Sequence, residues 1–221
     1  LQTKSEYSIA WLDYFSYTEN EIKSIFQTGD FIETRDQPGT SSKSSSTPGL
    51  AMITIPFDLP SWFMNRVFIR TFNSLYFRLI KRSKKENLVH YDSFLFPLDK
   101  IKDWNKCYGK NGFIQYQFVL PVSAALEGIG EILRAIHKSS HWVVLCTLKR
   151  LGKKNEHSPM SFAEEGFTLA LDFKITKELF EFLNQLDDMV IKYNGKIYLA
   201  KDARMRSETF HKMYSKPEKL D

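Results

Sequence analysis

The chain has 221 residues, of which 43% are hydrophobic and 26% are charged, a balance typical of globular domains rather than of disordered chains. Its 31 Lys and Arg residues against 26 Asp and Glu residues give a net charge of +5. That charge is mildly basic and falls short of the extreme typical of nucleic-acid-binding domains. No apolar run reaches the ~18 residues that a membrane-spanning helix needs.

The residue patterns that usually mark a catalytic or metal centre are sparse. Cys107 and Cys146 do not form a C-x-x-C pair, and two cysteines are too few for a disulfide scaffold or a zinc site. Neither a glycine-rich phosphate loop nor a dense cluster of His, Asp and Glu residues occurs, so we predict no metal site. We therefore expect a cytoplasmic protein in a reducing compartment, and we expect this chain to be a piece of a larger one.

In the first half of the chain, the apolar pattern changes from that of strands to that of a helix. Residues 7–14 and part of 22–33 are predicted strands, and the Ser-, Thr-, Gly- and Pro-rich residues 35–49 predict a mobile loop. Residues 61–85 have a helical period with many basic side chains, and residues 87–110 are expected to be an extended connection. The apolar face of this helix would comprise Met64, Phe68, Phe72, Leu75 and Leu79.

The second half alternates strand and helix patterns. The order β-α-β-β-α-β over residues 112–200 is that of a ferredoxin-like unit, in which helices cover one face of an antiparallel sheet. The predicted fold class is therefore α+β. The predicted strands are 112–121, 141–150, 166–174 and 196–200, and the predicted helices are 123–138, 176–192 and 207–214.

Side-chain alternation divides the predicted strands into an apolar face and a polar face. A polar face can simply be solvated, as it is in many antiparallel sheets. Paired glutamines beside aromatic residues favour a second interpretation, in which the face binds a hydroxyl-rich ligand. The polar face would comprise Gln115, Gln117, Thr147, Lys149, Thr168, Ala170 and Asp172.

The chain also contains a collinear set of distinctive motifs: YSIAWLDY (7–14), FLFPLDKIKDWNKCYG (94–109), GFIQYQFVLP (112–121), LKRLG (148–152), SFAEEGFTLALDF (161–173) and GKIYLAKDARMRSETFHKMY (195–214). Together they resemble FAD-linked oxidases of the vanillyl-alcohol-oxidase type. Within that family the likeness is to the decaprenylphosphoryl-ribose oxidases and, more distantly, to sugar-lactone oxidases. The resemblance implies that residues 1–221 form a substrate-binding, or cap, domain, and that the FAD-binding domain precedes them.

The resemblance also implies roles for particular residues. Lys201 and Tyr198 match residues beside the flavin, where a cation would stabilise the negative charge that develops during hydride transfer. Lys149 matches a lysine of the substrate pocket. The other matched pocket positions are Gln115, Gln117, Thr168, where relatives often have asparagine, and Ala170, where some have cysteine.

These residues also have purely structural interpretations. Lys201 could form a surface ion pair with Asp202. Lys149 could end a strand in solvent, and Tyr198 could be a core aromatic residue. For Asp172 a structural role is the favoured interpretation.

The function that the resemblance implies is that of an FAD-dependent oxidoreductase acting on a sugar alcohol carbon, with this chain alone inactive. The substrate would be a polyprenyl-phosphate sugar or, alternatively, an aldonolactone or alditol, and a reductase subunit completing an epimerase would be the partner. The basic residues 61–85 suit a polyprenyl phosphate or peripheral contact with an anionic membrane, or else a helix packed on the sheet. An RNA-recognition module has the same element order. However, Tyr116 and Phe118 fall on the face expected to be buried, so no nucleic-acid partner is predicted.

Overall fold

The computed structural model describes residues 4–19, 21–32, 53–60, 63–82, 86, 88–96, 100–153 and 160–214. The predicted mobile loop 35–49 lies outside these ranges. The chain divides into two compact units, and each is described by itself. The first unit comprises Ser8–Gln27 and Phe113–Asp221, and the second comprises Gln2–Tyr7 and Thr28–Gly112.

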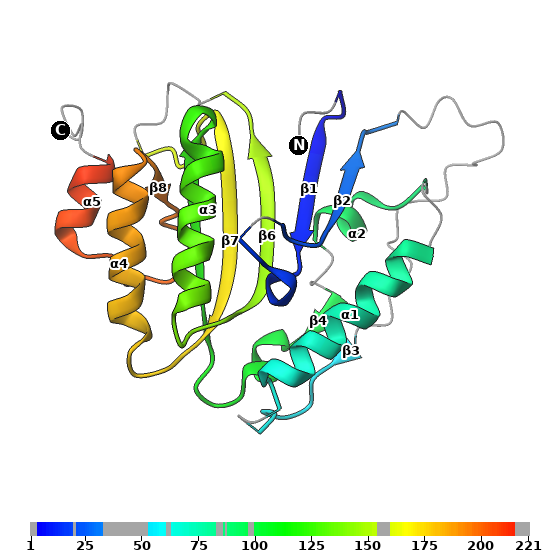
Figure 1. The fold of residues 1–221 in the computed structure, drawn as a ribbon. Coiled ribbons are helices and arrows are strands. Elements are labelled where there is room, and N and C mark those ends of the chain that lie inside the picture. Colours follow the sequence, from blue (N-terminus) through cyan, green and yellow to red (C-terminus); the bar gives the residue numbers. More distant parts are fainter. Residues whose placement is uncertain are drawn as a thin grey trace. The chain divides into compact units, whose positions relative to one another are not determined.

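The main sheet has six strands: β1 (Tyr7–Leu12), β2 (Ser24–Gly29), β5 (Phe113–Pro121), β6 (Val143–Leu151), β7 (Gly166–Lys174) and β8 (Lys196–Ile197). Their spatial order is β2-β1-β6-β7-β5-β8 (Figure 1), and the neighbours from β1 to β8 pair antiparallel. The sub-order β6-β7-β5-β8 is the ferredoxin-like arrangement that the sequence predicts. β1 and β2 extend the sheet beyond its β6 edge.

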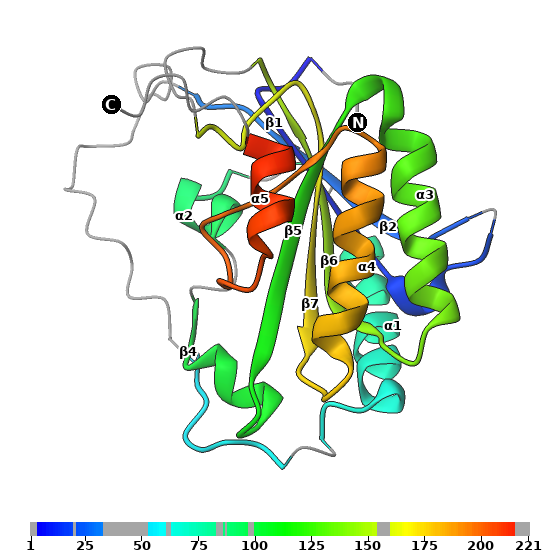
Figure 2. The ribbon, with the colours of Figure 1, turned by 90° about the vertical axis from the view of Figure 1, so that its left-hand side faces the viewer.

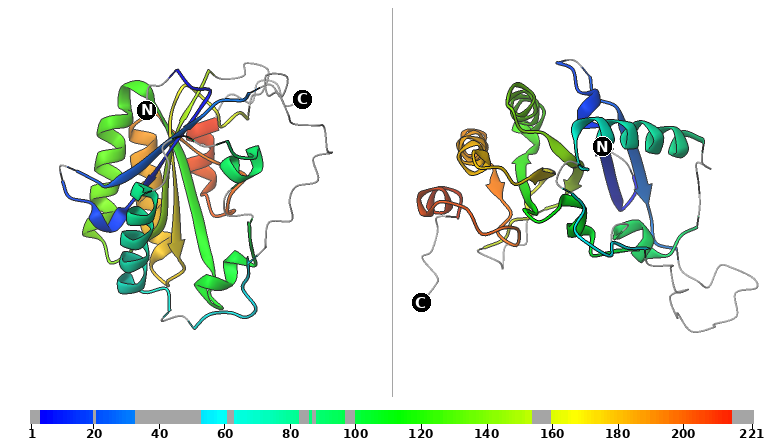
Figure 3. Two further views of the ribbon diagram at one scale, coloured as in Figure 1. Left: turned by 90° about the vertical axis from the view of Figure 1, so that its right-hand side faces the viewer. Right: turned by 90° about the horizontal axis from the view of Figure 1, so that it is seen from below.

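Two long helices, α3 (Val122–Lys138) and α4 (Leu179–Lys192), cover one face of this sheet, as Figures 2 and 3 show. The apolar sides of the strands and helices meet there, so the α+β prediction is confirmed. A third helix, α5 (Ser207–Tyr214), packs against α4 and β8. The core between sheet and helices includes Tyr116, Phe118, Leu120, Ile132, Ile136, Leu169, Leu171, Phe173, Leu183 and Leu186.

The boundaries in this half agree closely with the predicted ones, apart from the last strand. We expected a strand over residues 196–200, whereas β8 ends at Ile197. After Ile197 the regular pairing with β5 stops, and the following segment contacts the edge of β5 through individual hydrogen bonds. The Tyr198 N–H donates to the Gln117 carbonyl at 2.8 Å, and the Gln115 N–H donates to the Asp202 carboxylate at 2.8 Å.

The second unit contains smaller elements. Helix α1 (Arg66–Arg82) confirms the helix predicted within residues 61–85, and the Asn65 side chain caps its start by accepting the Phe68 N–H at 2.9 Å. The predicted extended connection 87–110 is wrong in part. It contains α2 (Tyr91–Leu95), a short strand β4 (Ile101–Lys102) paired in parallel with β3 (Ile53–Thr54), and a 3-10 turn (Trp104–Tyr108).

The buried side of α1 differs from the predicted one. Ile69 and Asn73 are buried, at 3% and 4% exposure, and Met64 is buried just before the helix. The side of α1 that packs against the rest of its unit is therefore the one that carries Ile69 and Asn73, next to the predicted apolar face. The predicted apolar face is exposed in its helical part, with 37% for Phe68, 55% for Phe72, 55% for Leu75 and 57% for Leu79.

Candidate functional site

The predicted polar residues lie on the face of the sheet opposite α3 and α4. Residues directly opposite one another in an antiparallel pair point to the same face, so the register defines cross-strand rows. The rows are Lys149–Thr168–Val119, Thr147–Ala170–Gln117 and Leu145–Asp172–Gln115. β5, β6 and β7 thus bring the polar residues of three separate motifs together on one surface.

Two side-chain hydrogen bonds orient the glutamines of this face. The Gln117 amide donates to the Thr168 hydroxyl at 3.0 Å, and the Gln115 amide donates to the Asp172 carboxylate at 3.0 Å. Thr168 and Asp172 are each only 1% exposed, whereas both glutamines are half-buried. The buried Thr168 and Asp172 therefore hold the side chains of the two glutamines in place. This is a structural role for Asp172, the interpretation that the sequence favoured.

A cluster of positive charge lies beside this face. The Lys149 side chain is exposed, but protein atoms crowd its ammonium, and this desolvation lowers the Lys149 pKa. The nearby Lys201 ammonium lowers the Lys149 pKa further. The Lys201 Nζ lies 5.8 Å from the centre of the Tyr198 ring, which in turn packs against Phe162 at 4.6 Å. The structure thus brings Lys149, Lys201 and Tyr198 into one neighbourhood, which suits an anionic ligand.

A hollow of about 470 Å³ lies next to these residues, between the edge of β5 and the segment that follows β8. Gln115, Tyr198, Lys201, Asp202 and Arg204 are among its lining residues. Asp202 accepts the backbone N–H of Gln115, and no Lys201–Asp202 ion pair occurs in the described part of the chain. The surface ion pair considered from the sequence is therefore not what holds Lys201.

A buried ion pair behind the hollow was not anticipated from the sequence. Arg204 donates to both carboxylate oxygens of Asp187, with Nη1 at 3.0 Å from Oδ2, and the Tyr116 hydroxyl donates to Asp187 Oδ1 at 3.1 Å. The Arg204 and Asp187 side chains are 6% and 0% exposed. One signal was available, because Asp187 directly follows Leu186 on the apolar side of α4, where a carboxylate requires a buried partner.

The cysteines offer no reactive thiol to this surface. Cys146 is paired with Leu171 and so lies on the helix-covered face, and burial raises the pKa of its thiol well above the ordinary value. Burial also raises the pKa of Cys107. A thiolate is the reactive form of cysteine, so both thiols are held in their inert state.

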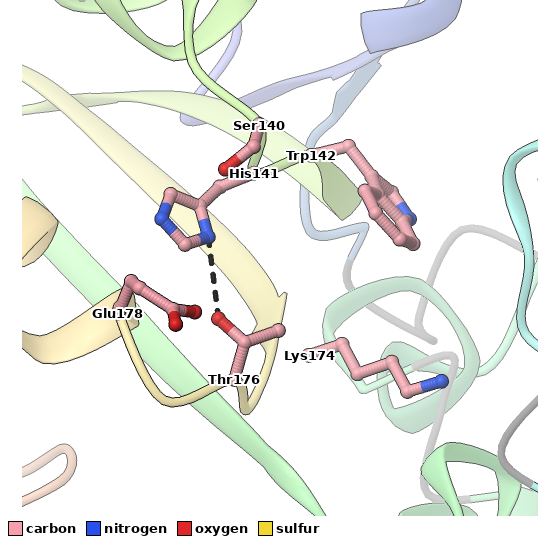
Figure 4. Close-up of a pocket in the computed structure, with 6 residues that line it drawn as sticks. All are labelled: Ser140, His141, Trp142, Lys174, Thr176 and Glu178. Carbon is pink, nitrogen blue, oxygen red and sulfur yellow. Dashed lines mark hydrogen bonds between the residues drawn. The ribbon is translucent and has the colours of Figure 1, made fainter.

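A second, smaller cavity of about 200 Å³ lies where β6 begins and β7 ends (Figure 4). Its His141 is buried and lies 3.5 Å from the Thr176 hydroxyl, and its ring stacks on Phe182 at 4.9 Å. Burial lowers the His141 pKa, and the Glu178 carboxylate partly opposes that shift. This cavity contains none of the residues to which the motifs assign a role.

The described residues were also searched for metal sites and membrane spans. They contain no group of three or more His, Cys, Asp or Glu side chains that could hold a metal ion. Among the described helices, none is long and apolar enough to cross a membrane.

No family model matches this chain, whereas comparison with curated proteins finds similar ones. One of them is an oxidase, the class that the motifs indicated. It is the decaprenylphosphoryl-β-D-ribose oxidase of Mycolicibacterium smegmatis, to which this chain is 33% identical over 211 residues. The alignment covers 94% of this chain and 45% of that protein, so the chain spans less than half the length of its relative. The resemblance drawn from the motifs is thereby confirmed.

Proposed function

We propose that this chain is the substrate-binding part of an FAD-dependent oxidoreductase that oxidises a hydroxyl-bearing carbon of a polyprenyl-phosphate sugar. The observation that carries the proposal is the meeting of Lys149, Lys201 and Tyr198 with the polar face of β5 and β7. The similarity to an oxidase of a lipid-linked ribose supports the same assignment. We further propose that a separate reductase subunit acts on the oxidised product and completes an epimerisation.

The residues present fit one edge of a flavin. Lys201 places a cation beside an aromatic ring, at a hollow that the β5 edge and the following segment enclose. A flavin supplies the hydride-accepting chemistry, whereas the protein supplies charge and orientation. Lys201 would stabilise negative charge on the edge of the ring, and Tyr198 would position both ring and substrate. Most contacts to FAD would come from outside this chain.

The substrate would lie on the polar face. Lys149, with its ammonium partly desolvated, suits a phosphate or hydroxyl oxygen. Gln115 and Gln117 would present their amide groups to the sugar, and the buried Thr168 would hold the Gln117 amide in place. Ala170 has the smallest side chain of that surface and would let the sugar ring approach the sheet.

The surface of α1 favours a lipid-linked substrate over the alternative aldonolactone or alditol. Its exposed apolar stripe of Phe68, Phe72, Leu75 and Leu79 suits a polyprenyl chain or a bilayer surface. The exposed side chains of Arg66, Arg70, Arg78 and Lys81 add positive charge to the same helix. We therefore include peripheral contact with an anionic membrane in the proposal.

The RNA-recognition alternative has no comparable support. Stacking on bases requires aromatic side chains on the uncovered face of the sheet. Tyr116 and Phe118 are instead in the core under the helices, at 2% and 0% exposure. Glutamines occupy the other face of the same strand.

The substitution Lys149→Met in the full-length protein tests the proposal. Loss of a charge-assisted hydrogen bond worth about 1.5–3 kcal/mol should raise KM for a polyprenyl-phosphate sugar roughly 10- to 100-fold. The matched control is Lys138→Met, at the exposed end of α3, which should leave KM unchanged. An unchanged KM in Lys149→Met, or a protein that contains no flavin, would contradict the proposal.

A further inference from the structure

The segment that presents Lys201 has no regular secondary structure of its own. It runs between the end of β8 at Ile197 and the start of α5 at Ser207. Its conformation therefore depends on individual contacts to the rest of the unit. The Tyr198 N–H bond to the Gln117 carbonyl anchors it before Lys201, and the Asp202 bond to the Gln115 N–H anchors it just after.

We propose that the buried cluster of Arg204, Asp187 and Tyr116 is a positioning device, which holds Lys201 beside Lys149. The role of Lys201 in catalysis rests on the proposed function, whereas the contacts that hold its segment do not depend on it. Arg204 is only three residues beyond Lys201, so it is the buried polar anchor nearest to Lys201 after the Asp202 contact.

The geometry of the cluster constrains both the position and the orientation of the guanidinium. Two N–H groups of Arg204 bind the two oxygens of Asp187, and a planar fork of this kind fixes orientation as well as distance. The guanidinium also lies 5.0 Å from the centre of the Tyr116 ring. Asp187 belongs to α4 and Tyr116 to β5, so the segment is tied at one point to both layers of the fold.

Net stability is a poor explanation for such a cluster. A buried ion pair pays a large desolvation cost, and well-packed apolar residues often replace it without loss. Burial indeed raises the pKa of Asp187 despite the opposing effect of Arg204. We therefore infer that the buried Asp187 carboxylate serves to hold Arg204, and with it the Lys201 segment, in one position.

The same two elements provide an internal control. Two residues further on, Arg206 binds Asp188, the next residue of α4, at 2.8 Å. These side chains are 43% and 60% exposed, compared with 6% and 0% for Arg204 and Asp187. Exposed pairs restrict their elements weakly, so Arg206 should not position Lys201.

The experiment follows the titration of the Lys149 side chain by NMR in the full-length protein with isotope-labelled lysine. Because the Lys201 ammonium lowers the Lys149 pKa, Lys201→Met should raise it. Arg204→Met should raise it in the same direction, by moving Lys201 away. In the double variant, the rise should equal that of Lys201→Met alone. Arg206→Met should leave the Lys149 pKa at its wild-type value.

A Lys149 pKa that stays at the wild-type value in Arg204→Met, while Lys201→Met raises it, would overturn the inference. Full additivity in the double variant would also overturn it, because it would show that the two changes act independently. If Arg204→Met lacks a cooperative unfolding transition, Arg204→Lys is titrated instead. It keeps the charge but loses the two-pronged bond, and the Lys149 pKa should again rise. The readout needs neither flavin nor substrate, so it can fail independently of the proposed function.

Discussion

The packing of α3 on the sheet can be tested with two glycines of the same helix. A Cβ at Gly128 would lie 2.5 Å from Leu120 Cδ1 and 2.9 Å from Tyr193 Cγ, whereas a Cβ at Gly130 would meet nothing within 4 Å. Leu120 is fully buried, so moving its side chain aside would disturb the packing of its neighbours. Gly130→Ala should therefore stabilise the protein by about 0.5–1 kcal/mol through helix propensity alone. Gly128→Ala has the same gain, offset by an overpacking cost of about 1–3 kcal/mol.

The propensity gain cancels when the two variants are compared, so their difference isolates the cost of crowding. Urea unfolding followed by circular dichroism gives both free energies of unfolding, provided that the m-values stay equal. We expect Gly130→Ala to be more stable than Gly128→Ala by about 1–3 kcal/mol. Equal stabilities within about 0.5 kcal/mol would refute the close approach of α3 to β5 at Gly128.

Two further predictions concern pH and membranes. Because the His141 pKa is lowered on folding, the unfolded chain binds more protons, so the free energy of unfolding should fall as pH drops through about 6.5 and level off below the folded pKa. His141→Phe, measured by urea unfolding at each pH, should make the free energy of unfolding less dependent on pH. The same pH dependence in His141→Phe as in the wild type would show that His141 is not its source. A double substitution, Phe72→Ser with Leu79→Ser, should weaken sedimentation with phosphatidylglycerol-containing vesicles at least about 10-fold. Leu126→Ser, at a 92% exposed leucine of α3, should have no effect, and equal losses in both variants would contradict a specific α1 contact.

The strands and their faces were predictable because side-chain alternation has an exact period of two residues. Once β5 and β7 are assigned, Gln115, Gln117, Thr168 and Ala170 must lie on one side. The register that brings Lys149 opposite Thr168 is a long-range property, and here the sequence supported it only through the resemblance.

The errors have equally specific causes. Helical periodicity located α1, but periodicity gives the apolar stripe and not the side that packing selects, so the prediction missed the burial of Ile69 and Asn73. α2 and β4 are too short to show any period. The Arg204–Asp187 pair joins residues 17 positions apart in different elements, and no local pattern encodes such a partnership.

The most direct test of the central claim is anaerobic reduction of the flavin by a polyprenyl-phosphate sugar in the full-length protein. Visible absorbance shows first whether a flavin is bound, and then how fast substrate bleaches it. We expect rapid bleaching in the wild type, slower bleaching at a given substrate concentration in Lys149→Met, and wild-type behaviour in Lys138→Met. A colourless protein, or a flavin that the lipid-linked sugar leaves oxidised, would contradict the account.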